Sequence, residues 1–580
     1  MEKKWQIMRP NAAAVKNLSD HLHCHPLTAI VLINRNLTSA RQISNFMAPS
    51  LGNIRPPYAI KDMEVAVKRI FRAITENEKI LIFGDYDADG ITATAVLLDF
   101  FRTIGARVSD YIPHRIEEGY SLQVHHIREQ ALPNGIQLII TADCGSGSHD
   151  AIVAARNAGI DVIVTDHHSI SENIPAAAAV LNPKRHDCPA GMEMLAGVGV
   201  AFALIICLRK YLREQNFWKH RPEPNLKNLC DLVALGTIGD MVPLVEENRI
   251  FSKTGLNLIR SALRPGISAL REVAGVADQM LDADDVAFRL VPRLNAAGRM
   301  DHASMALQLL MTDNIATARQ LAQSLNGLND RRQEQEKVVL NDIFSDFQHH
   351  PERLKKRTLV CCDSKWHQGV LGIVASRITE TYFRPVVLIA MRDDLGKGSA
   401  RSIPGVDLFS ALQSCQHCLE DFGGHSMAAG LSIRVEKLRE FQDAFEKAVT
   451  QMTDPEDWIP KLTIDAEIQL ADITENLIDE IEKLSPFGTG NPEPVFASRN
   501  VKVVSSKMVG KNHRKMALVQ DANPDAKPVF AIRFNAEGPM QTQTSFARIA
   551  FRLRWNRWNN NRALQLIVED AVQDHARMLL

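Results

Sequence analysis

Three aspartates close together early in the sequence could bind a metal ion. Asp85, Asp87 and Asp89 occupy alternate positions in GDYDADG, directly after an apolar segment that predicts a strand. Carboxylates this close repel one another unless a cation lies between them, and hard divalent cations prefer oxygen ligands. The pattern therefore predicts a site for Mg²⁺ or Mn²⁺. The alternative is an acidic turn in which the Asp side chains cap the next helix.

More acidic and histidine side chains follow other predicted elements: Asp143 in LIITADCGSG, Asp166, His167 and His168 in DVIVTDHH, and Asp240 in ALGTIGDMVPL. Ligands of open α/β sheets bind at the carboxyl ends of strands, so these groups are expected to converge. Imidazole beside carboxylates favours Mn²⁺, Fe or Zn over Mg²⁺ alone. So many ligands suit two ions roughly 3.5–4 Å apart, which can activate a water for attack at phosphorus. The predicted chemistry is metal-assisted hydrolysis of a phosphoester or phosphoanhydride.

The elements that must position these groups alternate between strands and helices. Strands are expected at 79–83, 108–113, 137–141 and 161–165, and helices at 91–101 and 148–158. This alternation predicts a parallel sheet with helices on both faces. A largely helical stretch at 303–346 follows, in which the charged run from Asp330 to Lys337 is interpreted as a solvated helix face. A second α/β unit starts near residue 357, and short alternating segments beyond about residue 454 predict a small β barrel.

The chain is too long, at 580 residues, for one hydrophobic core. We expect a lead-in at 1–57, a catalytic α/β domain at 58–312, a connecting helix at 313–350, a second α/β domain at 351–453 and a nucleic-acid-binding barrel at 454–580. The formal net charge of -1 means that a nucleic-acid partner must be met by a local basic patch. Nine cysteines without a disulfide framework indicate a reducing cytoplasm, and no apolar run is long enough to span a membrane.

A local basic patch does occur in the predicted barrel. Between Arg499 and Arg562, Lys and Arg greatly outnumber Asp and Glu, and Phe and Trp are interleaved with them. Basic grooves with stacking aromatics hold single strands in OB-type barrels. Arg554, Trp555 and Trp558 are the predicted DNA contacts. The alternative is that the barrel aromatics point inward and fill the core.

Four motifs, GDYDADG, ADCGSG, VTDHH and GTIGDMVPL, resemble in their order those of the DHH phosphoesterase superfamily. Downstream, VPRLNAAGR and GGHSMAAGLSI are similar to motifs of its RecJ branch and of the DHH-associated domain. The resemblance implies a Mn²⁺ or Mg²⁺ site, with two ions, held by Asp85, Asp87, Asp89, Asp143, His167 and Asp240. Some superfamily members have His where this chain has Phe83, so one ligand is missing, and either Asp85 or water takes its place.

The resemblance also implies which groups handle the DNA. The expected catalytic residues are Asp143, His168, Arg293 and His425. The expected phosphate and DNA contacts are Arg115, Asn295, Arg299, Ser399, Arg401, Gly423, Gly424 and His425. Among these, Arg115, Ser399 and Arg401 match a pocket for a 5′-terminal phosphate. Arg293, Asn295 and Arg299 either bind a phosphate near the scissile bond or only brace their helix.

The implied activity is a single-strand-specific 5′→3′ DNA exonuclease that releases mononucleotides in recombination and repair. Its implied partners are single-stranded DNA, a single-strand-binding protein and a RecQ-type helicase, and the chain is expected to be a cytoplasmic monomer with no membrane contact. One alternative is a relative that hydrolyses short RNA oligonucleotides, cyclic dinucleotides or pyrophosphate, but such relatives generally lack the long connector and basic barrel. The other is a catalytically inactive DNA-binding scaffold, against which the intact metal ligands argue.

Overall fold

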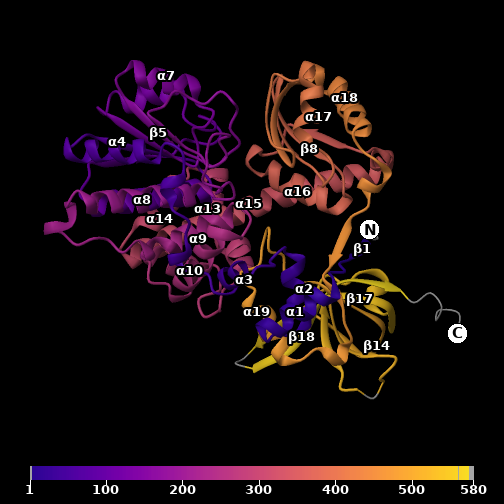
Figure 1. Cartoon of the computed structure of the whole chain (residues 1–580). Helices are drawn as coiled ribbons and strands as arrows, with labels where there is room; N and C mark the ends of the chain where they lie inside the picture. Colours follow the sequence, from indigo (N-terminus) through magenta and orange to yellow (C-terminus); the bar gives the residue numbers. More distant parts are fainter. Residues whose placement is uncertain (1–2, 525, 559–560, 574–580) are drawn as a thin grey trace. The chain divides into compact units, whose positions relative to one another are not determined.

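The computed structural model describes residues 3–524, 526–558 and 561–573, which divide into two compact units (Figure 1). Unit 1 contains Ile54–Val242 and Ile250–Pro460. Unit 2 contains Lys3–Asn53, Pro243–Arg249 and the described residues from Lys461 onward. The segment predicted as a lead-in thus belongs to the same unit as the C-terminal barrel. No described helix is long and apolar enough to cross a lipid bilayer.

Unit 1 opens with a five-stranded sheet whose strands are all parallel. Its order is β3-β2-β4-β5-β6, with β2 at Ile80–Gly84, β3 at Val108–Tyr111, β4 at Leu138–Ala142, β5 at Asp161–Thr165 and β6 at Ala179–Leu181. Every residue of β2 and β4 is buried, as expected for strands covered by helices on both faces. The predicted parallel α/β domain is confirmed. The strand order reverses between β2 and β4, and ligands of such sheets bind at this reversal.

Helices surround this sheet: α4 (Met63–Thr75), α5 (Ala88–Thr103), α7 (His149–Asn157), α8 (Gly197–Glu214) and α9 (Cys230–Gly239). Almost all of α5 is buried, and it packs between α8 and α9. Its sequence is apolar all round, as expected of a helix enclosed by other helices. The rest of this domain is also helical, with α10 at Glu246–Ser261, α11 at Pro265–Val273, α13 at Val291–Met300 and α14 at Ser304–Met311.

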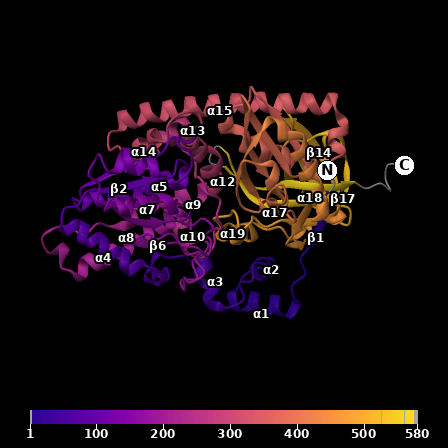
Figure 2. The same cartoon turned by 90° about the horizontal axis from the view of Figure 1, so that it is seen from above.

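The predicted connecting helix is α15 (Ile315–His349), one uninterrupted helix of 35 residues (Figure 2). The prediction that its charged run is solvated is wrong for Arg332 and Glu336, which are buried. They lie four residues apart on one side of the helix, where Arg332 Nε is 3.3 Å from Glu336 Oε1. Arg377 of α16 (Leu371–Tyr382) approaches the same carboxylate to 3.0 Å. Part of the charged run therefore attaches α15 to the second domain.

The second domain has a five-stranded sheet in the order β10-β11-β9-β8-β7. Its strands are β7 (Leu359–Asp363), β8 (Val386–Arg392), β9 (Leu395–Arg401), β10 (Asp421–Gly424) and β11 (Ala428–Arg434). Only β7 and β8 are parallel. The sequence GSARS, which resembles a turn locally, begins inside β9, and Gly423 and Gly424 end β10. Helices α17 (Leu408–Ser414) and α18 (Leu438–Gln451) complete the domain.

Unit 2 contains the predicted OB-type barrel. Strands β14 (Phe496–Val509), β15 (His513–Gln520), β16 (Val529–Arg533), β18 (Asn561–Gln573) and β17 (Ser545–Trp558) are neighbours in that order, and β17 pairs back onto β14. The short β13 (Ala466–Glu467) pairs in parallel with β14, and α19 (Glu475–Lys483) packs against β17. Helices α1 (Ala12–Leu22), α2 (Pro26–Asn34) and α3 (Ala40–Met47) follow β1 (Lys4–Ile7), which pairs with β12 (Lys461–Ile464). Side chains of α2 and α3 join the barrel core.

Candidate active site

The loops after β4 and β5, the first turn of α5 and the end of α9 bring four of the predicted metal ligands into contact. His167 Nε2 lies 3.2 Å from Asp143 Oδ1, 3.4 Å from Asp240 Oδ2 and 3.8 Å from Asp89 Oδ2. The side chains of His167, Asp143 and Asp89 are almost completely buried. Residues far apart in the sequence therefore meet at the reversal of the sheet, as the motif positions predict.

The remaining predicted ligands lie beside this group. Asp85, Asp87 and Asp143 offer carboxylate oxygens that all lie within 4.8 Å of one another. Asp89, His167 and Asp240 form a second such set. Because Asp143 also lies against His167, it is adjacent to both sets. These two donor sets would hold a pair of divalent cations.

Several of these atoms are buried without a hydrogen-bond partner among the described residues. They are Asp85 Oδ1, Asp143 Oδ1 and both ring nitrogens of His167. Leaving a buried polar atom unpaired costs about 1–3 kcal/mol, more when the group is charged. Carboxylate oxygens with an imidazole nitrogen form a donor set suited to Mn²⁺, and Mg²⁺ binds such oxygens as well. The residues present therefore fit a divalent cation.

The electrostatics of the cluster also favour a cation. Burial, together with the neighbouring charge of Asp87, raises the pKa of Asp89 to about 7. Burial and the surrounding carboxylates hold the pKa values of Asp85, Asp143 and Asp240 well above the ordinary range. So many carboxylates cannot all ionise in one buried place without a counterion, and a divalent cation would supply that charge.

Backbone N–H groups fix the orientation of two of the aspartates. Asp87 accepts hydrogen bonds from the N–H groups of Asp89 and Gly90, so it does cap α5, as the alternative interpretation of the motif predicts. Asp89 accepts from the N–H groups of Gly197 and Val198, at 2.7 and 2.9 Å, at the start of α8. A Cβ atom on Gly197 would lie 2.2 Å from Asp143 Oδ1, so this position needs glycine. Gly197 is not among the residues predicted from the motifs, although the glycines of GVGVA at the start of a predicted helix indicate a close approach of the backbone.

Asp166 organises the adjacent histidine. Its Oδ1 accepts from the backbone N–H of His168 at 3.1 Å and lies 2.8 Å from Nδ1 of the His168 ring. Burial opposes protonation of His168, but the hydrogen bond and charge of Asp166 outweigh it and raise the pKa of His168 to about 9. The hydroxyl of Tyr120 lies 3.2 Å from the same nitrogen. Asp166 therefore orients His168 and favours its protonated form, and Asp166 and Tyr120 are functional candidates beyond the predicted metal ligands and catalytic residues.

Six of the eight phosphate and DNA contacts predicted from the motifs line a pocket of about 360 Å³ within unit 1, and Asn295 and His425 are not among them. Its lining includes Arg115, Arg299, Ser399, Arg401, Gly423 and Gly424. Burial, with the charges of Arg115, Arg332 and Arg401, lowers the pKa of Arg299 to about 9. Guanidinium groups that repel one another in a glycine-lined pocket form a strong site for an anion such as phosphate. The Arg115 guanidinium also lies 4.7 Å from the ring centre of Tyr86, the residue between Asp85 and Asp87.

Two residues of the RLNAAGR motif act as braces. All three nitrogens of the Arg293 guanidinium donate to protein oxygens, namely Asn326 Oδ1 on α15 and the carbonyls of Arg289 and Val273. These contacts join α13 to α15 and favour the bracing alternative for Arg293, whose catalytic role stays a prediction. Asn295 Oδ1 accepts from Ala88 N–H at 2.7 Å and so holds the start of α5.

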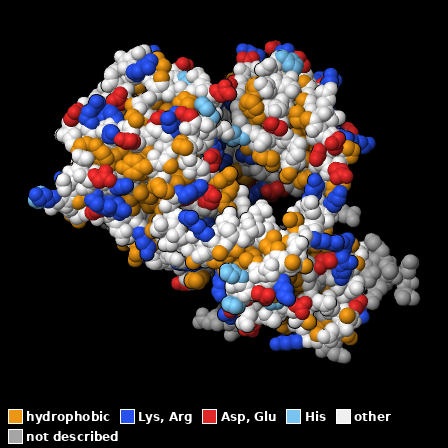
Figure 3. Space-filling view, in the orientation of Figure 1, with side chains coloured by type: hydrophobic (Ala, Val, Ile, Leu, Met, Phe, Trp, Pro, Cys, Tyr) orange, Lys and Arg blue, Asp and Glu red, His pale blue; other side chains and the backbone are white. Residues whose placement is uncertain are grey.

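His425 approaches the metal cluster from the second domain. Its ring lies parallel to that of His168 with 6.5 Å between the centres, and its Nδ1 is 3.4 Å from the hydroxyl oxygen of Ser169. Figure 3 shows a hollow between the two lobes of unit 1, with histidine side chains in pale blue beside it. The His425 side chain is exposed. His425 is therefore open to a substrate that enters next to the cluster.

Phe83, the position at which some superfamily members carry a ligand, is fully buried in the sheet. Its ring stacks on Tyr111, with 5.8 Å between centres, and contacts His126 at 4.9 Å. Phe83 is thus part of the packing that supports the loop after β3.

Trp555 and Arg554, two of the three barrel residues predicted to contact DNA, are engaged within the protein. Trp555 is only 7% exposed, belongs to the barrel core and donates a 2.9 Å hydrogen bond to Asp479. The expectation that Trp555 stacks on bases is therefore corrected, because its side chain is buried and the Arg562 guanidinium lies over one face of its ring, 3.7 Å from the ring centre. Arg554 pairs with both carboxylate oxygens of Glu493. The side chain of Trp558 lies outside the described residues.

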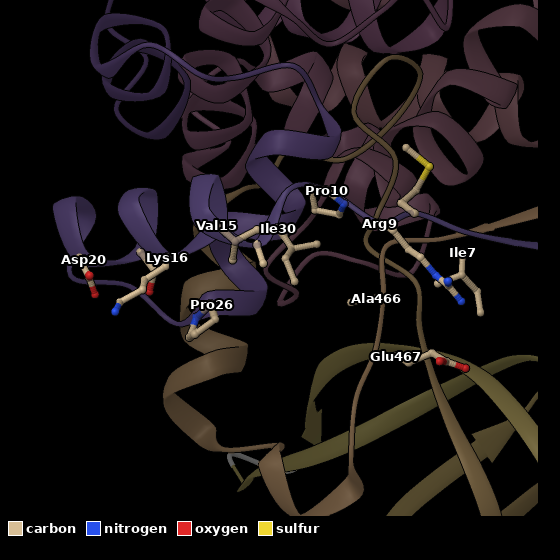
Figure 4. Close-up of a pocket in the computed structure, with 13 residues that line it drawn as sticks. Ile7, Arg9, Pro10, Val15, Lys16, Asp20, Pro26, Ile30, Ala466 and Glu467 are labelled. Carbon is tan, nitrogen blue, oxygen red and sulfur yellow. The ribbon is translucent and has the colours of Figure 1, made fainter.

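A separate cavity of about 500 Å³ lies in unit 2, between α1, the segment after β1 and β13 (Figure 4). Its lining is mainly apolar, with Arg9, Lys16, Asp20 and Glu467 as its charged members. Asp20 and Glu467 lie at opposite ends of it (Figure 4), and Glu467 pairs with Arg499. With no His or Cys in its lining and its acidic groups apart, this cavity is unsuited to metal-assisted hydrolysis.

The parallel sheet and the buried carboxylate–histidine cluster at its reversal define a metal-dependent phosphoesterase. Family models match the chain in the expected order: the N-terminal domain of the DHH family at 79–237, the DHHA1 domain at 355–451 and the RecJ OB domain at 464–570.

Curated relatives match nearly the whole chain. The single-stranded-DNA-specific exonuclease RecJ of Escherichia coli is 37% identical over 98% of this chain and 99% of its own length. The RecJ protein of Bacillus subtilis is 34% identical over 98% of this chain and 70% of its own length. The crystal structure of Thermus thermophilus RecJ with Mn²⁺ matches with a TM-score of 0.83 at 29% identity, covering 99% of this chain and 80% of that one. The chain belongs to the RecJ family.

Proposed function

We propose that this protein is a single-stranded-DNA-specific exonuclease that removes mononucleotides from the 5′ end, with Mn²⁺ or Mg²⁺ as cofactor. The observation that carries the proposal is the proximity of two sites: the carboxylate–histidine cluster and the three-arginine pocket, joined by Arg115 over Tyr86. A terminal phosphate in the pocket would place the first phosphodiester bond toward the cluster. The names of the relatives supply single-stranded DNA as the substrate.

The proposed ligands are Asp85, Asp87, Asp89, Asp143, His167 and Asp240, which offer oxygen and imidazole donors for two ions. When bound, divalent ions supply an activated water and stabilise charge at phosphorus. His168, held protonated by Asp166, offers a positive donor beside the cluster. Arg299 and Arg401 orient the terminal phosphate, and Ser399 adds a hydroxyl donor.

In place of Trp555, we assign the barrel's DNA contact to the outer face of β15 and β16, formed by His513, Lys515, Phe530 and Phe534. Phe530 and Phe534 are 50% and 48% exposed, which is unusual for aromatic side chains. Lys515 Nζ lies 5.7 Å from the centre of the Phe530 ring, and the His513 ring lies 5.2 Å from that of Phe534. Exposed rings beside cations are suited to stacking on bases and contacting the backbone without reading sequence. OB-type barrels use the face of these strands for oligonucleotides.

Family membership supports the wider role. We propose that the protein is a cytoplasmic monomer that acts in recombination and repair, with a single-strand-binding protein and a RecQ-type helicase as partners. No Walker A sequence is present, so a separate enzyme must unwind duplex DNA.

The test uses the purified full chain with Mn²⁺ and DNA labelled at its 3′ end. Progressive shortening of a 5′-phosphorylated single strand, with release of mononucleotides and no action on a blunt duplex, is expected. Equal degradation of duplex, or internal cleavage, would contradict the proposal. Bound but intact DNA would favour the scaffold alternative, and turnover of short oligonucleotides alone would favour the small-substrate alternative.

A further inference from the structure

The Glu118 carboxylate makes several hydrogen bonds that hold the loop carrying Arg115. This loop joins β3 to α6 (Val124–His126). Glu118 Oε1 accepts a 2.8 Å hydrogen bond from His114 N–H. Glu118 Oε2 accepts from the Tyr111 hydroxyl at 2.7 Å and lies 3.0 Å from His126 Nε2. One carboxylate thus ties together the end of a strand, the turn before Arg115 and a buried histidine.

The tautomer of His126 is fixed by a second contact. Its Nδ1 accepts a 2.9 Å hydrogen bond from the backbone N–H of Gln123, so Nε2 carries the proton and donates it to Glu118. The same geometry argues against a metal ion between Glu118, His125 and His126, whose ligand atoms lie within 4.8 Å. A histidine that binds a metal through Nε2 normally donates its Nδ1–H, and here Nδ1 is an acceptor. Glu118 and its partners Tyr111, His114 and His126 therefore form a hydrogen-bonded group, called the clasp below.

The clasp acts on one end of the loop. Arg115 directly follows His114, whose N–H is bound by Glu118, and its guanidinium lines the phosphate pocket. The other end has its own anchor: Ser121 Oγ accepts from Gly145 N–H at 3.1 Å and lies 2.8 Å from Ser148 Oγ. Loss of the clasp would therefore release the turn around Arg115 and leave the residues after Ser121 in place.

We propose that Glu118 is a positioning residue for recognition of the 5′-terminal phosphate. Glu118 holds Arg115 in the pocket before DNA binds. The inference rests on the proposed function, because it concerns the pocket assigned there. Ordering a long side chain and its turn costs conformational entropy, and a loop held in advance does not incur that cost on binding. Because Glu118 is not among the metal ligands, its loss should weaken binding of phosphorylated ends and spare the chemical step.

The test compares Glu118→Gln with Glu117→Gln on single strands that carry either a 5′-phosphate or a 5′-hydroxyl. Both variants lose one negative charge, but the Glu117 side chain is 79% exposed, makes none of the three hydrogen bonds to Glu118 and approaches His114 Nδ1 only to 4.0 Å. An amide at 118 turns an NH₂ group toward hydrogen-bond donors, so at least one of the three bonds is lost. For Glu118→Gln we expect KM for the phosphorylated strand to rise about tenfold, equivalent to about 1.4 kcal/mol. The value of kcat, and KM for the 5′-hydroxyl strand, should be unchanged. Glu117→Gln should keep the wild-type values.

Two further variants separate positioning from folding. Tyr111→Phe removes a single hydrogen bond of the clasp and should shift KM in the same direction by less. Arg115→Ala should abolish the preference for phosphorylated ends, and adding Glu118→Gln to it should change nothing more. The inference would be overturned if Glu118→Gln raised KM equally for both strands, or left the ratio of the two KM values as in the wild type. Either result would leave the exonuclease assignment intact. A wild-type protein that degrades no single strand would instead overturn the proposed function itself.

Discussion

The Arg115 guanidinium lies 4.7 Å from the centre of the Tyr86 ring and so joins the phosphate pocket to the metal cluster. Tyr86 stands between Asp85 and Asp87 in the sequence, and burial and the charge of Asp85 raise its pKa. A cation over this ring is stabilised by the π face. This contact therefore links the phosphate pocket to the segment that carries Asp85 and Asp87.

Replacing Arg401 with Lys should weaken recognition of the terminal phosphate. Arg offers a planar fork of donors, whereas Lys offers a point charge, so the net charge is kept and the bidentate contact is lost. We expect KM for 5′-phosphorylated strands to rise about tenfold, corresponding to one charge-assisted hydrogen bond. Steady-state kinetics would check this, with Arg434→Lys, an exposed arginine paired with Glu420 on the same sheet, as the control. Equal KM values for the two variants would remove Arg401 from the pocket.

Replacing Phe534 with Ala should weaken binding of long single strands without destabilising the barrel. The side chain is 48% exposed, so little core packing is lost. Loss of one stacked base is expected to cost about 1–3 kcal/mol of binding free energy. Fluorescence anisotropy with strands of increasing length would measure this, and cleavage of very short strands should be spared. Unchanged affinity for long strands would show that the DNA runs elsewhere.

Replacing Trp555 with Phe should lower the stability of the barrel and leave DNA binding unchanged, the reverse of the result expected for Phe534. The change removes the hydrogen bond to Asp479 and some buried ring area, so the free energy of unfolding should fall by about 1–3 kcal/mol. Binding of single-stranded DNA by the folded protein should be unchanged. Thermal unfolding and anisotropy on the same sample would check both. A loss of affinity with unchanged stability would restore the stacking role predicted from the sequence.

Replacing Glu336 with Gln should destabilise unit 1. The carboxylate is buried between Arg332 and Arg377, and its loss leaves a buried guanidinium without its counterion. Breaking a buried pair typically costs about 3–5 kcal/mol, and the half-exposed Arg377 places this case at the lower end. Urea unfolding would measure the loss. The control is Glu334→Gln, an exposed residue of the same helix, which should change little.

The sequence predicts the chemistry better than it predicts how side chains are shared between packing and binding. Asp143 and His167 converge as expected because strand ends meet at one edge of a parallel sheet, and Asp240 joins them from the end of α9. The bracing contacts of Arg293 and the burial of Trp555 do not follow from the sequence, because a motif and a local charge pattern do not show which partners a side chain finds. The acidic residues that cover the barrel arginines, such as Glu493, lie outside the basic segment in the sequence.

Glu336 shows the same limit within a helix. Its charged neighbours suggest a solvated face, and only the packing of α16 against α15 reveals that this carboxylate is buried. Long-range packing therefore accounts for these errors, whereas the motif order was sufficient for the fold class and the site's location.

The most direct test measures metal-dependent shortening of a 3′-labelled, 5′-phosphorylated single strand by the wild-type protein, Asp143→Ala and Asp150→Ala. Asp143 lies between both ligand sets, while Asp150 is an exposed aspartate in the first turn of α7. We predict activity with Mn²⁺ or Mg²⁺ for the wild type and Asp150→Ala, none with EDTA, and a loss of at least about a thousandfold for Asp143→Ala, about 4 kcal/mol of barrier. Activity in EDTA, or an Asp143→Ala variant as active as Asp150→Ala, would contradict the account.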